Sequence, residues 1–161
     1  MTNLWKDSGE MTKLPFELPY KIFSLNNDSG DNIELVLTDM YDYPNNKNFW
    51  GGYEFCGSFK LQINSTLLQK MNFYFTTSDL HDFYKELLNC NEKLNGQAKY
   101  KPKCNDATPI NIEVKYEKNG QCGIKCTYKD CDDIFNFCFS SNQSYIQQTI
   151  NELQIFYNQI K

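Results

Sequence analysis

The chain has 161 residues, of which 40% are hydrophobic and 16% aromatic, and it carries a formal net charge of −4. A chain of this length can bury one sizeable core, and its 12 Phe and 11 Tyr favour sheet faces over a helical bundle. The negative charge disfavours nucleic acid as a partner and favours a basic protein.

The N-terminal segment and the cysteines bear on the compartment of the protein. Residues 1–13 have no hydrophobic periodicity, so we expect a flexible segment there, followed by one domain over residues 14–161. No stretch is apolar enough to be a signal-peptide core or a membrane span. The seven Cys are odd in number and accompany no export signal, which indicates free thiols. We therefore expect a cytoplasmic protein without membrane contact.

The first half of the chain is predicted to be a strand meander closed by a helix. Apolar or alternating runs predict strands over residues 20–25, 33–40, 53–63 and 68–75. Gly57, inside the third run, indicates a bulge or a close backbone approach. Apolar residues from Leu80 to Leu94 then recur at helical spacing, with Thr77 or Ser78 as the N-cap and Gly96 as the stop.

The second half repeats this plan. Strands are predicted over residues 97–102, 109–117, 122–129 and 134–139, and Asn119-Gly120 predicts a hairpin turn. The helix that follows has one apolar face, made of Tyr145, Ile146, Thr149, Ile150, Leu153, Tyr157 and Ile160. The predicted fold is therefore α+β, with two antiparallel strand meanders that are each followed by one helix, roughly ββββα-ββββα.

A short passage occurs once in each half, at the junction of strand and helix. Residues 72–77 read NFYFTT and residues 136–141 read NFCFSS. The alternating Phe residues of each passage share one face of a strand, and the hydroxyl residues after them are predicted to cap the helix. A strand that ends in a cap is a general solution, with ancient duplication as the alternative. Neither interpretation makes the passage a catalytic site.

Residues with catalytic or metal-binding chemistry are few. The single histidine, His81, is predicted to lie on a solvated helix surface, where no Ser or Cys motif adjoins it. A small hydrolase that uses Asp132 or Asp133 with His81 is one alternative, and it requires these side chains to meet in one cleft. Cys122, Cys126 and Cys131 do not have the spacing of paired zinc knuckles, so buried thiols are expected rather than zinc. We expect no enzyme activity, metal or cofactor.

A binding surface is predicted at an unusually aromatic loop. Tyr and Trp are frequent among the residues that anchor protein interfaces, and acidic residues steer basic partners. The predicted partner contacts come from the strand end and loop that include residues 39–53, and they are Asp39, Tyr41, Asp42, Tyr43, Trp50 and Tyr53.

Besides a binding protein and a small hydrolase, a third alternative is an intracellular scaffold protein that assembles with itself.

The sequence resembles the WapI-type immunity proteins of bacteria over most of residues 33–160. The resemblance is carried by SFKLQI, by FYFTTSDLHDFYKELLNCNEKLNGQA and by FCFSSNQSYIQQTINELQIF. Leu80, Phe83, Leu87, Leu94 and Gly96 match the family's first helix pattern, although Cys90 stands where another apolar residue is usual. Tyr145 and Leu153 match its closing helix.

This resemblance implies both a fold and a function. It implies an α+β protein whose topology is similar to the Whirly arrangement, but the basic single-strand-binding motif of Whirly proteins has no counterpart here. The implied function is tight, non-catalytic binding of one cognate toxin domain from a polymorphic, contact-dependent toxin system. Together with the acidic balance of the chain, the resemblance predicts a basic, nuclease-type toxin as partner and no nucleic-acid binding.

Overall fold

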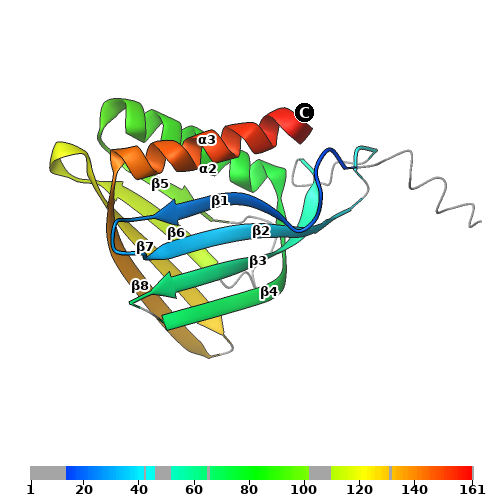
Figure 1. The fold of residues 1–161 in the computed structure, drawn as a ribbon, viewed down its shortest axis with the longest axis horizontal. Coiled ribbons are helices and arrows are strands. Elements are labelled where there is room, and N and C mark those ends of the chain that lie inside the picture. The colour runs from blue at the N-terminus through cyan, green and yellow to red at the C-terminus, as the bar shows by residue number, and fades with distance from the viewer. Residues whose placement is uncertain are drawn as a thin grey trace, which may run out of the picture.

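The computed structural model describes residues 14–41, 43–45, 52–64, 66–101, 110–130 and 132–160. Residues 1–13, predicted to be flexible, lie outside these ranges, as do Asp42, Trp50 and Cys131. The elements follow the chain as strands β1 Tyr20–Asn26, β2 Asn32–Met40, β3 Glu54–Ile63 and β4 Thr66–Thr76, helix α2 Thr77–Lys93, strands β5 Gln97–Tyr100 and β6 Ile110–Tyr116, a 3₁₀ turn Lys118–Gly120, strands β7 Gln121–Asp130 and β8 Asp133–Asn142, and helix α3 Gln143–Ile160 (Figure 1).

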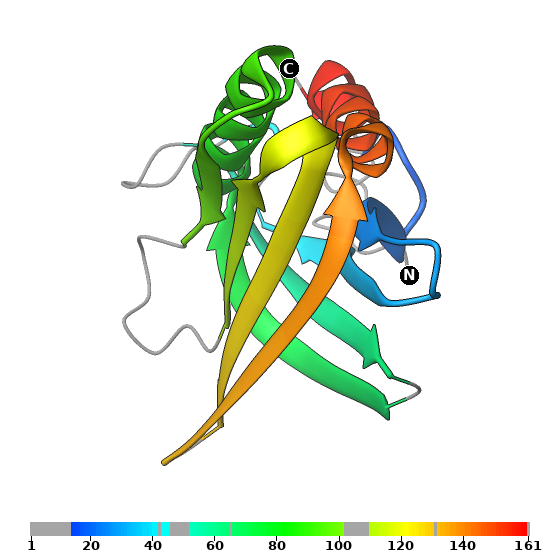
Figure 2. The ribbon, with the colours of Figure 1, turned by 90° about the vertical axis from the view of Figure 1, so that its left-hand side faces the viewer.

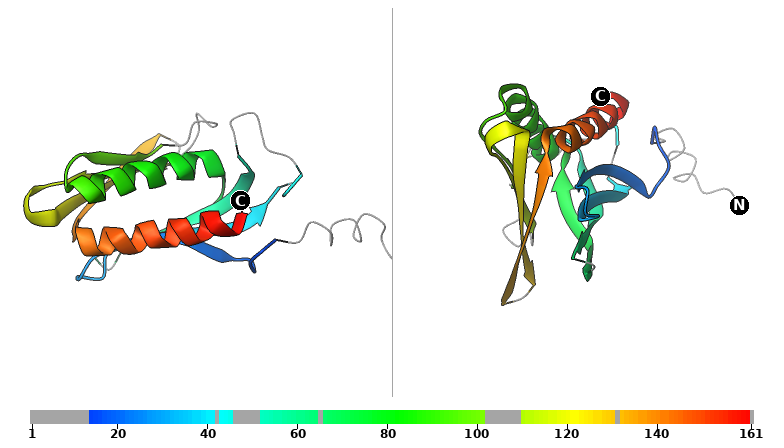
Figure 3. Two further views of the ribbon diagram at one scale, coloured as in Figure 1. Left: turned by 90° about the horizontal axis from the view of Figure 1, so that it is seen from above. Right: turned by 60° about the vertical axis from the view of Figure 1, so that its left-hand side comes forward.

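The strands form two antiparallel sheets in simple meander order. Sheet A has the order β1-β2-β3-β4, and sheet B has the order β5-β6-β7-β8. The two helices lie side by side above the sheets, and the sheets diverge below them (Figures 2 and 3). The predicted α+β class, with a helix after each meander, is confirmed.

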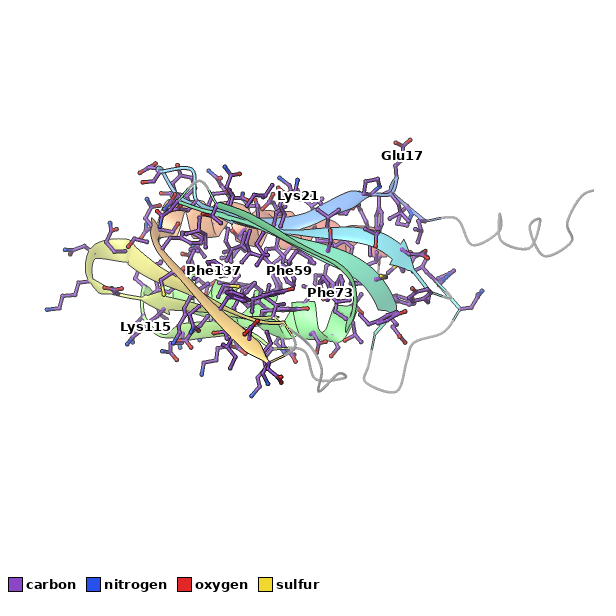
Figure 4. The ribbon with its side chains drawn as sticks, turned by 90° about the horizontal axis from the view of Figure 1, so that it is seen from below. Glu17, Lys21, Phe59, Phe73, Lys115 and Phe137 are labelled. Atoms are coloured by element: carbon purple, nitrogen blue, oxygen red, sulfur yellow. The ribbon has the colours of Figure 1, made fainter. Side chains whose placement is uncertain are left out.

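The core fills the space between the sheets and beneath the helices. Phe59 and Phe73 of sheet A lie between the two sheets, where Phe137 of sheet B also points (Figure 4). Phe59 meets Tyr100 of sheet B with ring centroids 5.8 Å apart, so aromatic contacts join the two halves. Gly57 is the predicted close approach, since a Cβ there would lie 2.7 Å from the Val36 carbonyl oxygen. The register also shifts beside it, between Gly57 and Phe59.

The helix caps differ by a few positions from the predicted ones. Thr76, not Thr77 or Ser78, is the N-cap of α2, because its side chain accepts a hydrogen bond from the Asp79 amide at 3.3 Å. At α3 the Asn142 side chain accepts from the amides of Ser144 and Tyr145. The Ser141 hydroxyl, expected to cap the helix, instead donates to the Asn26 carbonyl at 2.6 Å.

Each helix also binds the outer edge of a sheet. The Ser24 amide of β1 donates to Glu152 of α3 at 2.9 Å, and the Thr149 hydroxyl donates to the Ser24 carbonyl at 2.6 Å. In the other half, the Lys99 amide of β5 donates to Glu86 of α2 at 3.0 Å. Side chains of the helices therefore satisfy backbone groups that an edge strand otherwise leaves to water. Neither described helix has the length and hydropathy needed to cross a bilayer.

Candidate partner-binding surface

The predicted contact residues lie where β2 ends, where β3 begins and beside the start of α2. Asp39 is exposed, and its carboxylate accepts a hydrogen bond from the Met40 amide at 2.8 Å. Tyr41 follows β2, and its amide donates to the Glu54 carbonyl of β3 at 3.0 Å. This bond closes the strand pair just before the loop. Two of the other four predicted contacts, Asp42 and Trp50, lie outside the described ranges.

Tyr41 forms an aromatic pair with a residue of β4. Its ring lies 6.0 Å from that of Tyr74, which is 46% exposed. Desolvation, followed by the neighbouring Cys56 and Tyr74, raises the pKa of Tyr41 to about 12. Tyr41 is therefore a neutral hydrogen-bonding group at physiological pH, and the two rings offer a partner an amphipathic contact.

Tyr43 and Tyr53 form a second aromatic pair, which attaches the loop to α2. Their rings meet edge to face at 4.9 Å, and Tyr53 is buried at 8% exposure. The Tyr53 amide donates to the Thr77 hydroxyl oxygen at 2.8 Å, and the Thr77 amide donates to the Tyr53 carbonyl at 2.9 Å. Of the predicted contacts, Tyr53 is therefore placed to position the loop, while Tyr43 is half-buried beside it.

A cavity of about 370 Å³ opens beside this pair, between the start of α2 and the end of α3. On the helix side its walls include His81, Tyr84 and Tyr157. The His81 ring stands edge to face on Tyr157 at 5.1 Å, and the Tyr157 hydroxyl donates to the Thr77 carbonyl. Burial raises the pKa of Tyr157, and the charges of Asp82 and Asp79 raise it further. We call the three tyrosine pairs of this region, Tyr41–Tyr74, Tyr43–Tyr53 and Tyr84–Tyr157, the tyrosine cluster.

The chemistry of this surface suits binding. Rigid aromatic side chains bury a large area on association at little cost in conformational entropy. Asp39 places a carboxylate near the Tyr41 ring and Asp82 places one near Tyr157, which favours a partner with positive charge. Over the described part of the chain, no group of three His, Cys, Asp or Glu side chains is arranged to hold a metal ion.

The structure gives no support to the hydrolase alternative. Asp132 and Asp133 lie at the tip of the β7–β8 hairpin, where Asp130 pairs with Asp133. That tip is far from the helices, and His81 belongs to α2 and contacts Tyr84 and Tyr157 (Figure 1). The single cleft that this alternative required is not formed.

Two of the three cysteines considered for zinc, Cys122 and Cys126, confirm the expectation of buried thiols. Cys122 and Cys126 are buried free thiols, whose pKa values desolvation raises to about 11 and about 12. Buried and protonated, this pair has the character of small apolar groups. The third member of the proposed zinc set, Cys131, lies outside the described residues.

Sequence reasoning missed half of the tyrosine cluster. Tyr74 lies in the alternating strand NFYFTT, where its exposed position between Phe73 and Phe75 was the available signal. Helical spacing places Tyr84 and Tyr157 on the apolar helix faces, yet both are only half-buried. Their meeting with His81 depends on how the two helices pack, which periodicity within one helix does not reveal.

Comparison with known proteins bears on family membership. A search among curated proteins gives no match. One solved structure that resembles this chain is that of the plant transcriptional regulator PBF-2, with a TM-score of 0.48 and 6% sequence identity over 90% of this chain and 84% of that one. The model of the immunity protein WapI-like family matches residues 24–160. With most of its length matched, this chain belongs to the immunity protein WapI-like family.

Proposed function

We propose that this protein neutralises one cognate bacterial toxin domain by direct, tight and non-catalytic binding. Membership of the WapI-like immunity family carries the proposal. The tyrosine cluster supports it with a set of aromatic anchors at one end of the molecule. A binding protein of this kind needs a complementary surface and no catalytic residues of its own.

The proposed partner is a basic nuclease toxin of a polymorphic, contact-dependent system. The net charge of −4 would attract a basic domain and speed its association at low salt. The protein would act in the cytoplasm, where a delivered nuclease meets its substrate. In this proposal the immunity protein itself contacts neither nucleic acid nor membrane.

The proposed contacts are Asp39, Tyr41, Asp42, Tyr43 and Trp50, to which we add the exposed Tyr74. The tyrosines would supply buried area and the aspartates long-range attraction. Tyr53 would act by holding the loop on Thr77, because its amide and carbonyl are both bonded there.

Co-expression with the toxin domain encoded by the neighbouring gene tests the proposal. We expect the protein to restore growth and the purified pair to form a stable complex. A double variant, Tyr41→Ala with Tyr74→Ala, should weaken binding by about 10- to 100-fold, the loss usual for two aromatic anchors. Ile155→Ala, which alters a 55% exposed residue on α3, is the matched control. Growth arrest despite expression of the folded wild-type protein would overturn the proposal.

Charge steering can be separated from anchoring. Asp39→Asn keeps an acceptor for the Met40 amide and removes the carboxylate charge. We expect this variant to slow association at low salt and to leave dissociation nearly unchanged, as rim charges do. A faster dissociation with unchanged association would show that Asp39 is not a steering residue.

A further inference from the structure

The edge of β8 differs from the other three sheet edges, those of β1, β4 and β5, in being both uncovered and regular. The edges of β1 and β5 are bound by α3 and α2, through Ser24 and Lys99 respectively. The ladder between β3 and β4 is broken by a register shift. By contrast, β7 and β8 pair without interruption over ten positions, which leaves β8 as a long and regular edge.

The register of the β7–β8 hairpin shows which backbone groups face outward. Asp130 pairs with Asp133 across a two-residue connection, so this closing pair is hydrogen bonded. Bonded and non-bonded pairs then alternate along the ladder, which directs the amides and carbonyls of Ile134, Asn136, Cys138 and Ser140 to the open edge. The Asn27 side chain confirms this assignment, since its amide donates to the Ser140 carbonyl at 2.9 Å.

Above Ser140 the edge is closed, and below it the edge is open. Besides the Asn27 bond, the Ser141 hydroxyl ties β8 to the Asn26 carbonyl in the β1–β2 turn. From Ile134 to Cys138, no described residue outside β7 donates to or accepts from the backbone. The hairpin reaches below the other strands of sheet B (Figure 2).

The side chains of this open segment lack the usual protection of an edge strand. Ile134 is 57% exposed and Phe135 is 43% exposed. The stretch IFNFC over residues 134–138 contains no Lys, Glu, Asp or Pro. Proteins normally guard exposed edges with such residues, so an unguarded and regular edge is a template for an added strand.

Carboxylates flank the open segment at both ends. Asp132 and Asp133 are exposed at the hairpin tip, where Lys129 of the neighbouring strand offsets only part of their charge. At the upper end lies a cavity of about 370 Å³, whose walls include Asp28, Asp31, Cys138 and Ser140. A lysine or arginine side chain of a strand laid along β8 could enter this cavity.

From these observations we propose that residues 134–138 of β8 accept an extended strand of the cognate toxin, with a neutral centre and basic residues at its ends. The proposal rests on the proposed function for the identity of the partner. Backbone bonds from Ile134, Asn136 and Cys138 would give affinity, and the flanking aspartates would select the basic ends.

A second copy of this chain fits the same edge less well. An antiparallel pairing about a two-fold axis at Asn136 places the tip of each hairpin against the β1–β2 turn of the other copy. Asp132 and Asp133 would then approach Asp28 and Asp31, and like charges opposed in a sheet are destabilising. Charge therefore favours a basic partner strand over self-association.

The test compares two substitutions at one position. Asn136→Pro removes the outward amide hydrogen and should lower affinity for the toxin domain by about tenfold or more, whereas Asn136→Ala should stay within about threefold of wild type. Proton exchange followed by NMR gives a second measurement on the wild-type protein. The amides of Ile134, Asn136 and Cys138 should become protected from exchange when the toxin binds.

The outcomes separate the two proposals. If wild-type protein binds and neutralises the toxin but both variants bind equally and the three amides stay unprotected, the strand proposal is wrong and the proposed function stands. If wild-type protein does not bind the toxin, the proposed function fails, and the strand proposal fails with it. A wild-type dimer in light scattering that Asn136→Pro converts to a monomer would assign the edge to a second copy instead.

Discussion

Tyr53 and Thr77 hold each other by two hydrogen bonds, one from each backbone amide. The Tyr53 amide reaches the Thr77 hydroxyl oxygen, and the Thr77 amide reaches the Tyr53 carbonyl. These bonds join the start of β3 to the first residue of α2. Thr77 thus gives the loop a fixed end beside the tyrosine cluster.

Thr77→Val should therefore destabilise the protein by about 1–3 kcal/mol, because the buried Tyr53 amide loses its acceptor. Urea unfolding measures the change. Ser78→Ala, at the next and half-buried position, is the control and should cost much less. A Thr77→Val protein as stable as that control would contradict this account of the loop.

A second prediction concerns Gly52, which lies against the Thr77 hydroxyl. Its φ is +84°, and a Cβ there would lie 1.9 Å from the Thr77 hydroxyl oxygen. Gly52→Ala should cost more than Gly30→Ala, since Gly30 also has a positive φ of +86° but nothing lies within 4 Å of its added Cβ. Equal losses in the free energy of unfolding would mean that backbone strain alone decides both.

Glu152 should matter more to stability than the ion pair that it forms. Its carboxylate pairs with Lys21 at 3.0 Å, but Lys21 is 49% exposed, so that contact is screened by water. The same carboxylate accepts from the buried Ser24 amide. We expect Glu152→Ala to cost about 1–3 kcal/mol and Lys21→Ala to cost less than about 1 kcal/mol in denaturant unfolding. A larger loss for Lys21→Ala than for Glu152→Ala would show that the ion pair, and not the hydrogen bond to Ser24, provides the stability.

Cys138 should be distinguished by its reactivity. It is exposed on β8, whereas Cys56, Cys90, Cys122 and Cys126 are buried. Cys138→Ser should remove one equivalent from the fast reaction of the folded protein with a disulfide reagent at pH 8. An unchanged fast phase would show that the thiol is shielded in solution.

Alkaline pH should weaken the fold through Cys126. Burial raises the pKa of this thiol from 9.0 to about 12, so the unfolded chain loses the proton first as the pH rises. The stability that the folded protein gains from this raised pKa is fully present below pH about 9, and it is lost progressively as the pH rises to about 12. Denaturant unfolding at pH 8, 10 and 11 should show this fall, and Cys126→Ala should make it shallower. If the free energy of unfolding falls as steeply with pH in Cys126→Ala as in the wild type, the buried tyrosines rather than Cys126 cause the fall.

The elements could be predicted from sequence because alternation and helical spacing are local signals. The boundaries were less secure, since Thr76, Thr77 and Ser78 can each cap a helix and only the backbone geometry selects Thr76. Phe156 was missed, although it stands three residues after Leu153 and is fully buried against Phe55. Its signal was present in the helical spacing.

The site was harder to predict than the fold. The loop aromatics identified one end of the molecule, but the cavity needs α2 and α3 to bring His81 and Tyr157 together. The open edge of β8 was beyond sequence reasoning for the same reason. Composition shows that residues 134–138 lack charge, but only strand order shows that they belong to the last strand of sheet B, whose backbone bonds to no described residue outside β7 over this stretch.

The attachment of α3 to β1 has a consequence for synthesis. Ser24 and Glu152 are separated by 128 positions in the chain, so the first strand waits for the last helix before its edge is covered. During translation, sheet A can form its meander while that edge is still a template for pairing with other nascent chains. Synthesis of α3 is thus the step that protects the edge of sheet A from pairing with other chains, and a chain terminated before α3 would lack that protection.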